Sequence, residues 1–136
     1  MKIGSFDIFL NGELYAPSTY WQAPLKDKEA VTNGCGPESK LAALVPNHFY
    51  GLDMDCVCDI HDWMYTYGES YLDKLIADMV FFLNCALRID ANSNWLTMIP
   101  RYTQAAVYFV AVHKGGDGAF WAEKEKPRED PFIWRG

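Results

Sequence analysis

The residues best suited to carry chemistry lie between Cys56 and Tyr65. On a helix, four side chains of this segment share one face: Cys58, His61, Asp62 and Tyr65. A thiol, an imidazole, a carboxylate and a phenol are an unusual set for a packed face, because each must find a polar partner or lose solvation energy. An imidazole has an ordinary pKa of about 6.5, so it can accept a proton near neutral pH. The segment therefore indicates a general base, with a half-exposed face and a satisfied histidine as the simpler structural alternative.

A second carboxylate, Asp78, lies between Ala77 and Met79 in an apolar stretch. Carboxylates are rarely buried without a partner. The short loop at Gly68–Glu69 makes the helices on either side of it antiparallel neighbours. We therefore expect Asp78 to lie opposite His61 and to accept a hydrogen bond from one nitrogen of its ring. On the second helix, one stripe contains Asp78, Phe82, Cys85 and Ile89.

Four cysteines allow three disulfide pairings. Measured from the expected imidazole–carboxylate contact, Cys56 and Cys85 lie about 7.5 and 10 Å along their helices, at ~1.5 Å per residue. These similar heights are compatible with the ~5.5 Å Cα separation of a disulfide. The geometry favours a Cys56–Cys85 bridge, which leaves Cys35 for Cys58.

Zinc binding is an alternative use of the same region. The candidate ligands are Cys35, Cys56, Cys58 and His61. A Cys-x-Cys-x-x-His pattern differs from the usual spacing of zinc ligands, and it gives no role to Asp78 or Tyr65. We therefore regard zinc as the weaker interpretation.

Three long helices are expected to position these residues, over 53–67, 70–90 and 101–112. The first is expected to end at Gly68 and to be capped by Asp53 or Asp55. Ser70 followed by Asp73 resembles a capping box at the start of the second. The third is almost continuously apolar, which predicts burial on most of its sides.

Shorter features complete a single domain over residues 1–136. Asn11-Gly12 between two apolar runs, 6–10 and 13–15, predicts a β-hairpin. We expect irregular structure over 17–32, a short helix over 38–44 and a surface strap over 123–130. The fold class is therefore mainly α.

Composition sets further limits. The chain has 136 residues, half of them hydrophobic, which is enough for one packed core. Its net charge of −6 argues against nonspecific nucleic-acid binding. No apolar run approaches the ~20 residues of a transmembrane helix, and the first residues form no secretory signal peptide. Between Asp53 and Asp78, seven acidic residues accompany one base, Lys74, a pattern typical of a solvated face or of attraction for a hard divalent cation.

Together these motifs resemble secreted phospholipase A2. The resemblance covers roughly residues 32–89 and rests on three elements: Cys58-x-x-His61-Asp62-x-x-Tyr65, the upstream loop Gly34-Cys35-Gly36, and the downstream pair Ala77-Asp78. It is closer to the minimal bacterial, fungal and viral members than to the disulfide-dense venom type. It implies a phospholipase A2-like fold in which two antiparallel, disulfide-linked helices carry the site, beside a small N-terminal β-hairpin and a calcium loop.

The resemblance also implies roles for single residues. His61 matches the general base, Asp78 the aspartate that orients it, and Tyr65 the phenol that hydrogen-bonds this aspartate. Ca²⁺ is implied as cofactor, and its ligands would be the Asp62 carboxylate and the backbone carbonyls of Gly34, Gly36 and Glu38. A Cys35–Cys58 bridge matches the one that ties the family's calcium loop to its catalytic helix.

The implied activity is calcium-dependent hydrolysis of the sn-2 acyl ester of glycerophospholipids, by a His-Asp dyad that activates water. The chain would then be a carboxylic ester hydrolase acting at a membrane interface, either exported without a visible signal peptide or associated with a virion or effector. The alternative is a catalytically silent phospholipase A2-like module that binds a protein or a membrane. His48 and His113 are expected to be bystanders. Six aromatic residues are expected at loops or rims, where such rings favour a membrane boundary: Tyr20, Trp21, Trp63, Trp121, Phe132 and Trp134.

Overall fold

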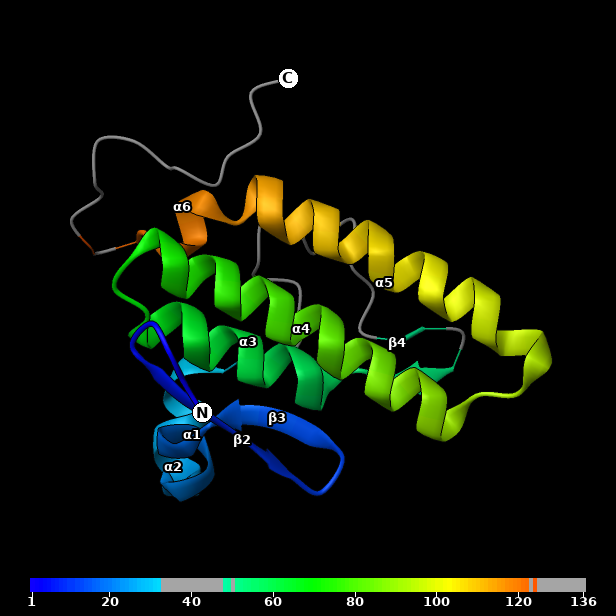
Figure 1. Ribbon diagram of the computed structural model, residues 1–136, viewed down its shortest axis with the longest axis horizontal. Coiled ribbons are helices and arrows are strands. Elements are labelled where there is room, and N and C mark those ends of the chain that lie inside the picture. Colours follow the sequence, from blue (N-terminus) through cyan, green and yellow to red (C-terminus); the bar gives the residue numbers. More distant parts are fainter. Residues whose placement is uncertain (33–47, 50, 123, 125–136) are drawn as a thin grey trace.

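Three long helices lie side by side in alternating directions and form most of the protein (Figure 1). They are α3 (Asp55–Tyr67), α4 (Tyr71–Asn92) and α5 (Trp95–Gly115). The smaller elements are β1 (Lys2–Ile3), β2 (Phe6–Asn11), β3 (Leu14–Pro17), α1 (Ser18–Gln22), α2 (Leu25–Val31), β4 (His48–Phe49), β5 (Leu52–Asp53) and α6 (Asp117–Phe120). This computed structural model describes residues 1–32, 48–49, 51–122 and 124. The mainly helical fold is as expected. The short helix predicted over 38–44 lies outside the described residues, and so does the surface strap predicted over 123–130 apart from residue 124.

The N-terminal hairpin forms where the sequence predicts it. Strands β1, β2 and β3 make an antiparallel sheet, and the pairing of Asn11 with Leu14 leaves Gly12 and Glu13 as the turn. Gly12 has φ +66°, which favours glycine. Asn84 of α4 holds β3 on the side away from β2. Its side-chain amide accepts from the Tyr15 N–H at 2.8 Å and donates to the Tyr15 carbonyl at 2.7 Å.

The expectation of irregular structure over 17–32 is wrong. Helices α1 and α2 each begin directly after a proline, Pro17 and Pro24. Their φ angles of −59° and −60° suit a helix start, where a missing N–H costs no hydrogen bond. The prolines therefore begin these helices rather than break them.

Helix α3 ends at the predicted position for a different reason. Gly68 is its C-cap but has φ −70°, outside the left-handed region. A Cβ atom at Gly68 would lie 2.6 Å from Cε2 of Phe120, so glycine is needed for the close approach of α6. At the other end Met54 is the N-cap, while the Asp53 side chain accepts from the Asp55 N–H at 2.8 Å.

The start of α4 is tied to the N-terminal sheet through Asp73. The N-cap half of the predicted capping box is present, since the Ser70 hydroxyl accepts from the Asp73 N–H at 3.1 Å. The buried carboxylate of Asp73 accepts from the N–H of Glu69 and, with its other oxygen, from the N–H of Ser5, each at 2.8 Å. Gly4, with φ +60°, leaves room for this contact, because a Cβ there would lie 2.4 Å from Oδ1 of Asp73.

Helix α5 is longer and more exposed than expected. It begins at Trp95, where Asn94 and Thr97 form a capping box that sequence reasoning missed. The prediction of burial on most sides is wrong, since only one stripe is buried: Arg101, Ala105, Tyr108 and Val112. Val107 and Val110 are half-exposed because α5 packs against α4 from one side.

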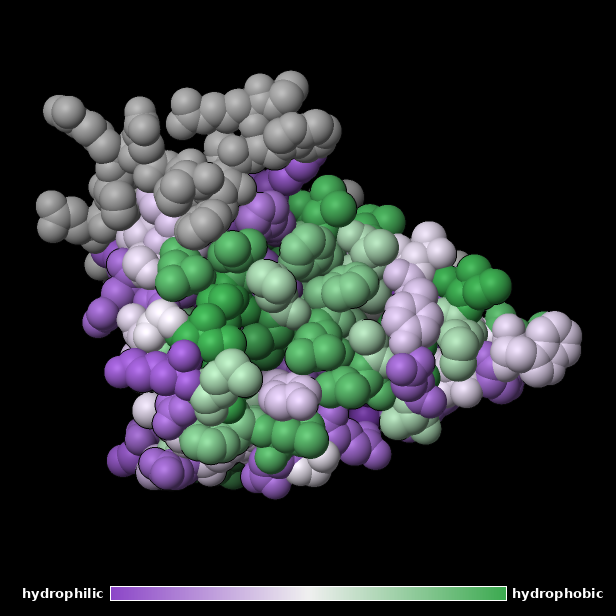
Figure 2. All heavy atoms as spheres, in the orientation of Figure 1, coloured by the Kyte–Doolittle hydropathy of each residue, from purple (hydrophilic) through white to green (hydrophobic). Residues whose placement is uncertain are grey.

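The core lies between the helices and under the sheet. One cluster joins Val57, Phe81 and Tyr108 of the three long helices, and a second joins the sheet to α3 and α4. Phe81 is buried, whereas Phe82, which shares the stripe of Asp78 and Cys85, is exposed. Figure 2 shows apolar side chains gathered over α4 and α5, where Met79, Phe82, Leu83, Val107 and Val110 are exposed. Among the described helices, none is long and apolar enough to cross a bilayer.

The predicted Cys56–Cys85 bridge is wrong. Both residues are free thiols, so no disulfide of theirs links α3 to α4. Cys85 is fully buried in the core and Cys56 packs at its margin, where each acts as a small apolar side chain. Equal height along two helices does not fix the direction of the Cβ atoms, which a disulfide also requires.

Candidate active site

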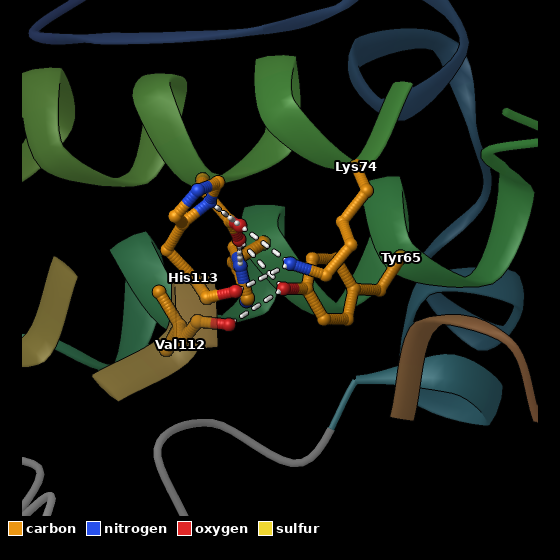
Figure 3. A network of polar contacts seen from close by, with 6 residues as sticks. Tyr65, Lys74, Val112 and His113 are labelled. Atoms are coloured by element: carbon orange, nitrogen blue, oxygen red, sulfur yellow. Dashed lines mark hydrogen bonds and ion pairs between the residues drawn. The ribbon is translucent and has the colours of Figure 1, made fainter. Parts of the chain in front are cut away.

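The candidate active site is centred on Asp78, whose carboxylate is fully buried between α3, α4 and α5 (Figure 3). Four side chains contact it: His61, Tyr65, Lys74 and His113. Two of them were predicted to do so and two were not. A buried carboxylate with this many polar partners is a specialised arrangement rather than a solvated face.

The first carboxylate oxygen, Oδ1, contacts the two predicted partners. Nε2 of His61 lies 2.9 Å from it, and the Tyr65 hydroxyl donates to it at 2.6 Å. His61 and Tyr65 are one turn apart on α3, and their ring centroids are 4.0 Å apart. The helical spacing that placed these residues on one face thus brings them to the same oxygen.

The second oxygen, Oδ2, has partners that sequence reasoning missed. Lys74 donates to it from Nζ at 3.1 Å, and Nδ1 of His113 lies 3.2 Å away. The signal for Lys74 was available, because it is the one base in the acidic stretch and precedes Asp78 by four residues. No comparable signal existed for His113, whose expected role as a bystander is wrong: its contact depends on how α5 packs.

These contacts set the protonation of the carboxylate and the phenol. Burial raises the pKa of Asp78, but the hydrogen bond and charge of His61, the charge of Lys74 and the Tyr65 hydroxyl outweigh it, so the pKa lies below its ordinary value. Burial, followed by the charge of Asp78, holds the pKa of Tyr65 well above its ordinary value. Asp78 is therefore an ionised acceptor and Tyr65 a neutral donor near neutral pH.

This protonation assigns the tautomer of His61. An ionised carboxylate accepts hydrogen bonds, so the ring proton lies on Nε2 and the lone pair on Nδ1. The ring is mostly buried and is packed against Tyr65 and Phe81, whose centroids lie 4.0 and 5.1 Å away. The arrangement is a histidine held by an aspartate, with Nδ1 as the basic atom.

The expected calcium ligands fall on both sides of the described boundary. Asp62 follows His61 on α3 and is partly exposed, whereas Gly34, Gly36 and Glu38 lie outside the described residues. Within the described ranges, no group of three or more His, Cys, Asp or Glu residues is placed to hold a metal ion. One carboxylate and three carbonyls are hard oxygen donors, which suit Ca²⁺.

Cys58 is disulfide-bonded. Cys35, its predicted partner, lies outside the described residues. Because zinc coordination uses thiolates, a disulfide-bonded Cys58 does not fit the zinc alternative.

The six aromatic residues expected at rims fall into three groups. Trp63 and Trp121 are buried and pack edge-on against Tyr20 and Tyr71. Tyr20 and Trp21 are half-buried, while Phe132 and Trp134 lie outside the described residues. Trp63 and Trp121 therefore contribute to packing.

Comparison with known proteins provides no relative. No protein-family model, curated protein or solved structure matches the chain. The residues of the site and their geometry are therefore the basis for inferring function.

Proposed function

We propose that this protein is a calcium-dependent phospholipase of the A2 type, which hydrolyses the sn-2 acyl ester of glycerophospholipids. The observation that carries the proposal is the 2.9 Å contact between Nε2 of His61 and Oδ1 of Asp78, with Tyr65 on the same oxygen. This contact joins two helices at residues that lie 17 positions apart. The resemblance of the surrounding motif to secreted phospholipase A2 supplies the substrate class.

The chemistry follows from the basic nitrogen of His61. Nδ1 takes a proton from water as the water oxygen attacks the ester carbonyl, and the imidazolium then gives this proton to the leaving alkoxide. The products are a fatty acid and a lysophospholipid. Asp78 stabilises the imidazolium and keeps the ring oriented, as the aspartate does in a catalytic triad, with water in place of serine.

Calcium is the proposed cofactor. The Asp62 carboxylate would hold it together with the backbone carbonyls of Gly34, Gly36 and Glu38. When bound, it would supply positive charge to polarise the ester carbonyl and to neutralise the substrate phosphate. His61 and Asp62 lie three and four residues after Cys58, in the stripe that also contains Tyr65, so the cation and the base would lie on the same broad face of α3.

The protein is proposed to be exported and to act at a membrane surface. Association with a virion or an effector is the alternative location. Support comes from the disulfide at Cys58, because disulfides persist in oxidising compartments. The substrate is then a phospholipid at a membrane interface.

The proposal is tested by fatty-acid release from mixed phospholipid vesicles, measured with calcium, with a chelator and with His61→Gln. We expect release that needs calcium and that falls by at least about 10³-fold in His61→Gln, since the base is lost. Release that ignores the chelator would reject the metal role. No release from any lipid, by a folded protein that still binds vesicles, would favour the silent binding module.

A further inference from the structure

Lys74 is a buried cation to which the proposed chemistry gives no role. It lies on α4 one turn before Asp78, and only 3% of it is exposed. Its ammonium group donates to Oδ2 of Asp78 at 3.1 Å and to the backbone carbonyl of His113 at 2.9 Å. Nζ also lies 5.9 Å from the centroid of the Tyr65 ring. Figure 3 shows the ammonium group of Lys74 beside His113, at the end of α5.

The contact with His113 gives Lys74 an anchor that does not depend on Asp78. The carbonyl of His113 belongs to the last turn of α5, where carbonyls have no partner within the helix. A cation is favourable at that end because of the helix dipole. The end of α5 therefore fixes the ammonium group, and the ammonium group in turn fixes Asp78.

Asp78 needs such support because its carboxylate can rotate. The last torsion of an aspartate is broad, and both His61 and Tyr65 engage the same oxygen, Oδ1. Lys74 and Nδ1 of His113 hold Oδ2. Contacts on both oxygens define the plane of the carboxylate, so Oδ1 stays directed at the imidazole of His61.

Charge supports the same role. The Asp78 carboxylate is fully removed from solvent, and an unpaired buried charge is strongly unfavourable. Lys74 is the permanent cation in contact with it within the described residues. Its charge contributes to keeping the pKa of Asp78 below the ordinary value in spite of burial, after the larger contribution of His61.

We infer that Lys74 is a positioning residue for ester hydrolysis: it holds the carboxylate of Asp78 in place so that Oδ1 retains the ring of His61. The inference rests on the proposed function for its reaction. The contacts themselves can be tested without any substrate.

The test compares Lys74→Met with Arg101→Met. Arg101 is a matched control, because it is a second buried cation between α4 and α5, donating to the carbonyl of Asn92 and the hydroxyl of Ser93 at the opposite end of these helices. We expect Lys74→Met to lower kcat about 10- to 100-fold with KM changed less than about twofold. Arg101→Met should lose thermal stability and keep kcat within about threefold. If Lys74→Met does not fold, Lys74→Gln keeps a donor for the His113 carbonyl and carries the same expectation.

A spectroscopic measurement separates this inference from the proposed function. The hydrogen-bonded Nε2 proton of His61 should give a downfield NMR signal, assigned by its loss in His61→Gln. At one fixed pH, we expect this signal to shift or broaden in Lys74→Met and to stay unchanged in Arg101→Met. An inactive wild-type protein would reject the proposed function and leave this comparison intact. A signal unchanged by Lys74→Met, or an equal loss of kcat in both variants, would overturn the inference.

Discussion

The hydroxyl of Tyr65 and the carboxylate of Asp78 are 2.6 Å apart, inside the protein and between two helices. The phenol donates to the same oxygen that faces His61, so it restrains this oxygen without competing for the ring nitrogen. Since the pKa of Tyr65 is held well above its ordinary value by burial and by Asp78, the phenol remains a donor in alkaline solution.

Tyr65→Phe should therefore weaken both activity and stability. A hydrogen bond to a charged group contributes about 1.5–3 kcal/mol. We therefore expect fatty-acid release to fall by roughly 10-fold and the free energy of unfolding to fall by about 1.5–3 kcal/mol. Tyr67→Phe is the control, because this phenol lies on the same helix but is half-exposed. Equal effects of the two substitutions would contradict the role of the Tyr65 hydroxyl.

Asp78→Asn should reduce the loss of folding stability that occurs as the pH falls into the acid range. The folded-state pKa of Asp78 lies below its ordinary value, so the ionised group stabilises the fold above about pH 4 and this contribution is lost as pH falls through the lowered pKa. At neutral pH we expect the variant to be about 3–5 kcal/mol less stable, because Lys74 loses its buried partner. Urea unfolding at a series of pH values should show the difference from wild type shrinking below about pH 4. A difference constant from pH 7 to pH 2 would be inconsistent with a lowered pKa.

The calcium requirement is expected to follow Asp62. Asp62→Asn removes the proposed carboxylate ligand and should weaken calcium activation by about 10-fold or more, measured as the calcium concentration that gives half-maximal release. Asp59→Asn is the matched control, since Asp59 lies one turn earlier on the same helix and is also partly exposed. If both substitutions left the calcium response unchanged, the ion would have to bind elsewhere.

Gly4→Ala should destabilise the attachment of the N-terminal sheet to α4. Gly4 and Gly12 have nearly equal φ angles, +60° and +66°, so alanine is strained by about 1–2 kcal/mol at either position. A Cβ at Gly4 would also lie 2.4 Å from Oδ1 of Asp73, whereas at Gly12 there is nothing within 4 Å. Chemical denaturation should therefore show a clearly larger loss for Gly4→Ala than for Gly12→Ala. Equal losses of stability in the two variants would mean that the sheet can shift away from Asp73 without a cost in free energy.

The sequence predicted contacts that depend on helix period and missed those that depend on packing. His61 and Tyr65 share a face of α3 through their spacing, and a short loop brings Asp78 opposite them. Lys74 lies four residues before Asp78 on α4, the same spacing, but the acidic stretch around it is typical of a solvated face or of attraction for a divalent cation. His113 reaches the site because α5 packs along α4, and no local pattern encodes the position at which the two helices cross.

The cysteines and prolines show the same limit. Helix rise brought Cys56 and Cys85 to similar heights, but the direction of their side chains decides whether a bridge forms. Pro17 and Pro24 lie in the segment 17–32, for which irregular structure is the expectation, although proline is equally suited to begin a helix. In each case the local rule allowed two outcomes, and the surrounding structure selected one.

The pairing of Asn84 with both main-chain groups of Tyr15 also bears on solubility. The edge strand of a sheet has unpaired main-chain groups, which can pair with strands of other molecules and so promote aggregation. On the side of β3 that faces away from β2, the Asn84 amide already pairs with the N–H and the carbonyl of Tyr15. Pro17, the next residue on that side of the strand, has no N–H to donate. The β3 edge of the sheet is therefore closed to the addition of a strand from another molecule.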